Sequence, residues 1–171
     1  AEDRGELVVA GYGYLSALSS MACRLDSTIE DIDIPFGKVS VKNNARLEIP
    51  SQVTLKVEKG ISVTGNGDFH TVANGGAIEL MPGEDGSFVV EGLVKAYEIY
   101  CTNSPGATIS FAQGAELRNL ENGTIKLLGT EEKSLSLVPV TQDGQWTMNV
   151  VAPDESKTFL QYLAVSNSQV D

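Results

Sequence analysis

The residues that could perform acid–base chemistry are few, and His70 is the sole histidine of the chain. A catalytic imidazole needs a nucleophile or a substrate proton within reach, and a carboxylate that orients the ring. The sequence does not place such partners beside His70, so a solvated histidine in a turn or at a strand end is the favoured interpretation. No zinc site of ordinary ligand spacing can be written, because one histidine is accompanied by only two widely separated cysteines.

Acidic residues occur in short clusters that would suit Ca²⁺ binding or glycoside hydrolysis if they faced one groove. Most of these clusters fall in expected turns. Carboxylates would face one groove only if they lay along stacked strands. Solvated turn charge is therefore the favoured interpretation, and weak Ca²⁺ binding by Asp31 and Asp33, or by Glu84 and Asp85, is the alternative. The clusters are Glu30–Asp33, Glu84–Asp85, Glu131–Glu132 and Asp154–Glu155.

The two cysteines, Cys23 and Cys101, lie far apart in the sequence. They can close one disulfide if the N-terminal segment folds back onto the body of the protein. Alternatively, they are two buried thiols that act as small hydrophobic side chains. We favour the bridge slightly, because nothing else in the sequence indicates a cytosolic protein.

Aromatic side chains offer a further binding hypothesis. They would form a sugar-stacking platform if they were exposed together. Their spacing does not place them on one face, so packing in the core or at its rim is favoured. The residues concerned are Tyr12, Tyr14, Tyr97, Tyr100 and Trp146.

A recurring phrase predicts the strands that must position these residues. In this phrase a small residue precedes alternating polar and aliphatic residues. Self-similar short units indicate stacking, because no single unit buries its own apolar face. Strands have a period of two residues, and strands of a β-sandwich have no reason to resemble one another. We therefore expect an all-β fold, a parallel β-helix or β-solenoid. The phrase occurs at Asn44–Ile49, Gly76–Leu80, Gly106–Phe111, Gly114–Leu117 and Gly123–Leu127.

The N-terminal region has a different pattern. Apolar residues recur every three or four positions over Tyr14–Leu25, which predicts a short helix that caps the first turn. Leu7–Ala10 is expected to form a short strand. The prediction divides the chain into an N-terminal strand and helix cap over residues 1–31 and a β-helix domain over residues 32–171. Short strands and Gly-, Asn- and Pro-containing turns fill the second part, and a coil of three strands is expected to take about 20–25 residues.

Leu47–Gly60 resembles the opening coils of bacterial cell-surface right-handed parallel β-helix proteins, which carry the phrase L-x-I-P-x-G-V-T-L-x-V-x-x-G. Asn122–Thr130 is similar to the second half of that family's pattern, and Trp146 resembles the tryptophan that opens a later coil. Gln52 departs from the pattern, since the family usually has glycine there. The resemblance covers Val39 to the C-terminus and implies a right-handed β-helix. The family includes adhesins, autotransporter passengers, polysaccharide lyases and glycoside hydrolases, so the fold leaves the activity open.

Composition limits the function. The formal net charge of −11 over 171 residues disfavours nucleic acid and anionic lipid as partners. The sequence contains no run of 18 or more apolar residues, so no membrane-spanning helix is expected.

We expect a secreted or cell-surface structural or adhesive module without enzymatic activity or a cofactor. It would self-associate into an oligomer or filament through open ends, or form part of a longer surface protein, with carbohydrate as a further candidate partner. The alternatives are a carbohydrate-active enzyme fragment of the same fold (a polysaccharide lyase or glycoside hydrolase), a carbohydrate-binding module, and a β-sandwich binding module.

Overall fold

The computed structural model confirms an all-β chain with parallel strands. It describes residues 6–9, 14–16, 35–49, 51–72, 75–151 and 155–170. These residues form sixteen β-strands and no helix. Every strand pairing among them is parallel. Parallel strands cannot be joined by tight hairpins, so each strand must pair with one that is distant in the sequence.

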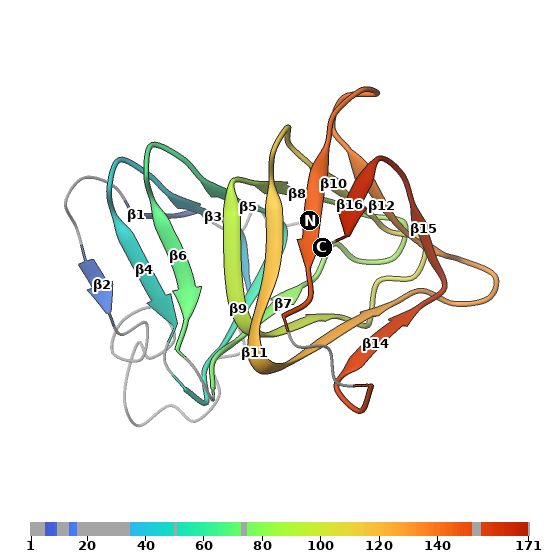
Figure 1. Ribbon diagram of the computed structural model, residues 1–171, viewed down its shortest axis with the longest axis horizontal. Coiled ribbons are helices and arrows are strands. Elements are labelled where there is room, and N and C mark those ends of the chain that lie inside the picture. Colours follow the sequence, from blue (N-terminus) through green and yellow to red (C-terminus); the bar gives the residue numbers. More distant parts are fainter. Residues whose placement is uncertain are drawn as a thin grey trace.

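The strands lie in three stacks along the long axis of the molecule (Figure 1). The first stack contains β1 (Glu6–Val9), β3 (Phe36–Val41), the end of β5 (Thr54–Val63), β8 (Ser87–Glu91), β10 (Thr108–Phe111), β12 (Leu135–Pro139) and β15 (Leu163–Val165). The second stack contains β2 (Tyr14–Ser16), β4 (Arg46–Ile49), β6 (Asp68–Thr71), the start of β9 (Leu93–Cys101), the start of β11 (Glu116–Leu128), β13 (Trp146–Asn149) and β16 (Ser168–Val170). The third stack contains the start of β5, β7 (Ala77–Leu80), the ends of β9 and β11, and β14 (Thr158–Gln161).

The chain visits the three stacks in a repeated order. From β3 onward it passes through the first, second and third stacks and then returns to the first. Val39 pairs with Ile61 on the first stack, and Leu47 pairs with Phe69 on the second. The partners in both pairs are separated by 22 residues, a period typical of stacked repeats. The arrangement is consistent with a β-solenoid, and the long strands β5, β9 and β11 join two stacks by bending at a corner.

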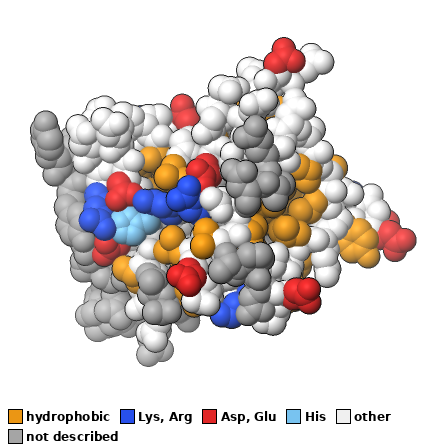
Figure 2. Space-filling view, viewed as in Figure 1, with side chains coloured by type: hydrophobic (Ala, Val, Ile, Leu, Met, Phe, Trp, Pro, Cys, Tyr) orange, Lys and Arg blue, Asp and Glu red, His pale blue; other side chains and the backbone are white. Residues whose placement is uncertain are grey.

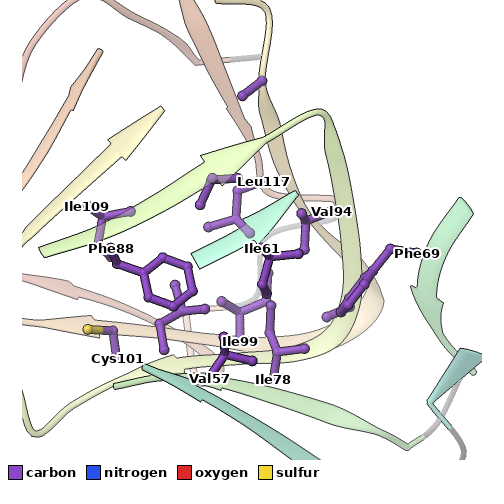
Figure 3. Close-up of a cluster of buried hydrophobic side chains, with 14 of the residues drawn as sticks. Val57, Ile61, Phe69, Ile78, Phe88, Val94, Ile99, Cys101, Ile109 and Leu117 are labelled. Carbon is purple, nitrogen blue, oxygen red and sulfur yellow. The ribbon is translucent and has the colours of Figure 1, made fainter. Parts of the chain in front are cut away.

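The core lies between the three stacks. In β8 exposed and buried residues alternate, so every second side chain of this strand faces inward. Because the register is parallel, inward residues of successive turns align in columns of apolar side chains. Figure 3 shows side chains from different strands converging in this interior. One column on the second stack consists of the buried residues Leu47, Phe69, Val94, Leu117 and Met148.

The corners between stacks use left-handed backbone. Asn43, Asn44 and Asn66 have φ between 54° and 64°, and asparagine tolerates this region better than most residues. Gln52 has a φ of 64°. The corner at Gln52 therefore keeps the left-handed conformation that glycine adopts most easily, although the side chain differs from the glycine of the family phrase.

The helix predicted from Tyr14 is wrong at its start. Tyr14–Ser16 form strand β2, and Leu15 is in register with the buried Leu47 of β4. A short apolar segment satisfies helical and strand spacing alike, and here pairing with β4 decides the outcome. Residues 17–25 of the predicted helix, and the domain boundary at residue 31, lie outside the described residues. The strand expected at Leu7–Ala10 is present as β1. Within the described ranges, no helix has the length and apolar character needed to cross a membrane.

Candidate functional site

The densest group of titratable side chains described lies on the outer face of the second stack. We call it the His70 cluster, and it consists of Arg46, Glu48, Asp68, His70 and Lys95. The parallel register assembles it, because Arg46 pairs with Asp68 and Glu48 pairs with His70 across β4 and β6. Lys95 follows Val94 of β9, which pairs with Phe69. Figure 2 shows this cluster as adjoining blue, red and pale blue side chains.

The contacts of His70 involve both of its ring nitrogens. Nη2 of Arg46 lies 2.8 Å from the ring Nε2. A guanidinium group can only donate hydrogen bonds, whereas Oε2 of Glu48, which lies 3.2 Å from the same Nε2, can only accept them. Nδ1 is buried and lies 3.3 Å from Oδ2 of Asp68, although the geometry is not that of a hydrogen bond. The side chain of His70 is 16% exposed, so these partners replace most of its water.

Asp68 is the electrostatic centre of the His70 cluster. Its carboxylate lies 2.9 Å from Nζ of Lys95 and 3.6 Å from Nε of Arg46. Burial acts to raise the pKa of Asp68, but the hydrogen bond and charge of Lys95, helped by His70 and Arg46, outweigh it and lower that pKa. Asp68 therefore remains an anion at neutral pH.

The His70 cluster resembles half of an acid–base site, since a carboxylate faces one ring nitrogen of the histidine. A nucleophilic site also needs a hydroxyl or thiol bonded to the other nitrogen. At Nε2 the described partners are Arg46 and Glu48, which are charged side chains without such a group. The geometry supports ion pairing between side chains of successive turns.

A lysine binds the two acidic residues that were proposed for Ca²⁺ binding and that the structure describes, Glu84 and Asp85. Glu84 and Asp85 lie in the turn between β7 and β8, and Nζ of Lys133 contacts them at 2.8 and 2.6 Å. Their hydrogen bonds, Asp85 first, raise the pKa of Lys133 to about 12. Asp31 and Asp33 lie outside the described residues. Among the side chains that are described, no group of three or more His, Cys, Asp or Glu is arranged to hold a metal ion.

Cys101 occupies an inward position at the end of β9. It is fully buried and in register with the buried Leu127. Burial raises the pKa of the Cys101 thiol to about 11, which makes it a poor nucleophile at neutral pH. Cys23 lies outside the described residues, so a bridge between the two cysteines stays a prediction.

The aromatic residues do not share one surface. Trp146 is 1% exposed and stacks on Phe111 with ring centroids 3.9 Å apart, so the interpretation as core packing is confirmed for this residue. Its Nε1 donates a hydrogen bond to the carbonyl oxygen of Ser166 at 2.9 Å. Tyr12 and the side chain of Tyr14 lie outside the described residues.

A smaller aromatic group, which the sequence analysis missed, lies on the outer face of the third stack. Lys126 is in register with both Tyr100 and Phe159. Its Nζ lies 4.9 Å from the ring centroid of Phe159 and 6.0 Å from that of Tyr100, within the range of cation–π attraction. Burial and a hydrogen bond with Glu98 raise the pKa of Tyr100 to about 12.

The last described turn presents an apolar surface. Leu160 of β14 is in register with Leu127, and Val165 of β15 with Leu137. Leu127 and Leu137 are fully buried, whereas Leu160 is 37% and Val165 48% exposed. Tyr162, between the two strands, is 53% exposed. We call these three side chains, with the outer edges of β14, β15 and β16, the terminal surface. No strand among the described ranges pairs with those edges.

Comparison with protein-family models, with curated proteins and with solved structures found no match to this chain. Three described surfaces are candidates for function: the His70 cluster, the aromatic group on the third stack and the terminal surface. Sequence analysis singled out His70 and anticipated an open strand edge. It missed Arg46 and Lys95, because their proximity to His70 depends on a register that joins successive turns.

Proposed function

We propose that this protein is a non-enzymatic structural or adhesive module of the cell surface, a right-handed parallel β-helix that self-associates end to end. Three stacks of parallel strands around one apolar core support the β-helix. Connections between parallel strands of one sheet are almost always right-handed, which supports the handedness. Stacked hydrogen-bond ladders make a stiff body, and the corners and outer faces are available for contact with a host or a neighbouring cell component.

The terminal surface is the observation that carries self-association. It combines apolar side chains at core positions with strand edges, and an exposed edge is a template for the addition of another strand. Strands β1 and β2 belong to the same stacks as β15 and β16. A second copy, or a further turn of a longer surface protein, can therefore continue the first and second stacks in parallel. Such a head-to-tail contact is heterologous and produces a filament when it does not close into a ring.

Sedimentation velocity over a range of protein concentrations, with electron microscopy of the same samples, tests this function. We expect particles that grow with concentration and elongated assemblies on the grid. Val165→Lys places a charge at the centre of the terminal surface and should leave a monomer. Val89→Lys is the matched control, because Val89 is 43% exposed on the side of the first stack and should not affect assembly. A monomer at every concentration, or equal behaviour of the two variants, would refute end-to-end association.

The second candidate function is carbohydrate binding. Tyr100, Lys126 and Phe159 form the one aromatic and cationic ladder described on the outer surface, and such rings stack on the apolar face of a sugar. A glycan array with the wild type and with Tyr100→Ala tests it. Binding that Tyr100→Ala abolishes supports this function, and absence of binding to every glycan removes it. Release of unsaturated or reducing ends from a polysaccharide would instead show an enzyme.

A further inference from the structure

A small hollow lies on the outer face of the first stack, where β3, β5 and β8 adjoin. In β5, the middle strand, Gly60 takes the outward position between Lys38 and Val89. A Cβ atom there would lie 2.6 Å from the backbone oxygen of Val89, so a side chain would force the backbone to shift. The row of outward side chains is therefore interrupted at β5. The hollow has a volume of about 210 Å³ and is lined by Lys38, Lys59, Ile61, Ser62, Val89 and Glu91.

Opposite charges lie on the two sides of the hollow. Lys38 belongs to β3, and Glu91 is the last residue of β8. Because β5 runs between these two strands, about 9–10 Å separate their backbones. Ser62 of β5 is in register with Glu91, and its hydroxyl donates a hydrogen bond to Oε2 of Glu91 at 2.5 Å. Ser62 is 5% exposed, so a side chain held in the sheet fixes the carboxylate.

The charged groups of the hollow can make further hydrogen bonds. The ammonium of Lys38 has three donors. The carboxylate of Glu91 has about four lone-pair sites, of which the bond from Ser62 uses one. Lys59 also lines the hollow, but it already has a partner of its own. Lys38 and Glu91 therefore offer one positive and one negative group to a ligand.

Charge and size restrict what this hollow can bind. A simple anion would be repelled by the carboxylate of Glu91, and a simple cation by the ammonium of Lys38. None of the six lining residues is aromatic, so a sugar ring has no face on which to stack. The volume of about 210 Å³ is below the roughly 300–1,000 Å³ of pockets for drug-sized ligands. A single small molecule that carries both charges fits these conditions.

We propose that the hollow binds one free aliphatic α-amino acid in its zwitterionic form. The carboxylate of the ligand accepts hydrogen bonds from Nζ of Lys38, whose flexible aliphatic stem lets the ammonium reach it. The ammonium group of the ligand donates to the carboxylate of Glu91. Val89, which lines the same hollow and is 43% exposed, packs against the aliphatic side chain of the ligand.

This site is separate from the surfaces that support the proposed function. The hollow is formed by β3, β5 and β8, whereas β14, β15 and β16 form the terminal surface and the aromatic group lies on the third stack. Failure of amino-acid binding would therefore leave self-association untouched. Conversely, a protein that is monomeric at every concentration would still bind the amino acid.

Titration of the ¹⁵N-labelled full chain with L-leucine, followed by ¹H–¹⁵N correlation NMR, tests the site. The backbone amide resonances of Lys38, Ser62 and Glu91 should shift together and saturate at millimolar ligand concentrations. Isocaproate, which lacks the ammonium group, and isoamylamine, which lacks the carboxylate, are the matched probes, because each keeps the branched carbon chain. Each should bind at least about five-fold more weakly than leucine, since it loses one charge pair.

Lys38→Gln and Glu91→Gln each remove one charge, and a glutamine at position 91 can still accept the bond from Ser62. Each variant should weaken leucine binding about five-fold. Lys42→Gln is the matched control, because Lys42 directly follows β3 but does not line the hollow, and its affinity should equal that of the wild type. The correlation spectrum also shows whether each variant is folded.

Three results would overturn the proposal. The first is the absence of saturable shifts at Lys38, Ser62 and Glu91 when leucine is added to the wild-type protein, a result that needs no variant to fold. The second is equal binding of leucine and either matched probe. The third is an unchanged affinity for leucine in a folded Lys38→Gln or Glu91→Gln variant.

Discussion

The column that contains Leu127 and Leu160 allows a matched test of the core. The two leucines are in register on neighbouring turns of the third stack, and both occupy inward positions. Leu127 is fully buried, and Leu160 is 37% exposed. Leu127→Ala and Leu160→Ala therefore remove the same atoms from two environments that differ chiefly in whether another turn covers them.

The expected losses follow from transfer and cavity terms. Leu→Ala removes about three carbons, worth about 0.8 kcal/mol each when buried, or roughly 2.4 kcal/mol. A rigid, fully enclosed site adds the penalty of a cavity, so Leu127→Ala should cost about 3–4 kcal/mol. At Leu160 part of the side chain is already in water and solvent can fill the gap. The transfer free energy and the cavity penalty are therefore both smaller than at Leu127. Leu160→Ala should lower the free energy of unfolding of the monomer by about 1–1.5 kcal/mol.

Urea unfolding followed by far-UV circular dichroism measures both values. It should be performed at a concentration at which sedimentation shows a monomer, because association stabilises the folded state. The expected result is a lower midpoint for both variants and a difference of about 2 kcal/mol between them. Equal losses, or a loss below about 1 kcal/mol at Leu127, would refute the claim that one column passes from a closed interior to an open end.

Three further results are expected. Trp146, the sole tryptophan, should emit at short wavelength and resist quenching by acrylamide, since it is stacked on Phe111 and 1% exposed; emission typical of water would contradict its place in the core. In a Cys23→Ala background, the Cys101 thiol should react with a thiol reagent at pH 8 far more slowly in buffer than in urea, because its pKa is raised to about 11; equal rates would show an accessible thiol. Asp68→Asn should be less stable than the wild type at neutral pH. Because the folded pKa of Asp68 is lowered, this difference should fade in acid as the pH falls through that value, and a difference that persists in strong acid would contradict the ion pair with Lys95.

The recurring phrase was sufficient to predict parallel stacking. In Gly106–Phe111, Ile109 and Phe111 are buried, and Ile109 is in register with buried residues on both neighbouring strands. The phrase works as a signal because it encodes the inward side chains of one strand, which must match those of the next turn. Gln52, which departs from the family phrase, has left-handed backbone with a φ of 64°.

The sequence was less informative where the outcome depends on partners distant in the chain. Leu15 fits a helical face as well as a strand, and only its alignment with Leu47 selects the strand. The His70 cluster depends on the lengths of successive turns, since an additional residue at a corner would place a different side chain beside His70. No local pattern around Arg46 or Lys95 signals that pairing.

The central claim is that successive turns stack in parallel, and backbone NOEs in the labelled protein test it most directly. The account predicts contacts that join each strand to the corresponding strand one turn later, such as Leu47 with Phe69 and Val39 with Ile61. Antiparallel contacts between strands adjacent in the sequence, such as Ala77–Leu80 with Ser87–Glu91, would contradict it.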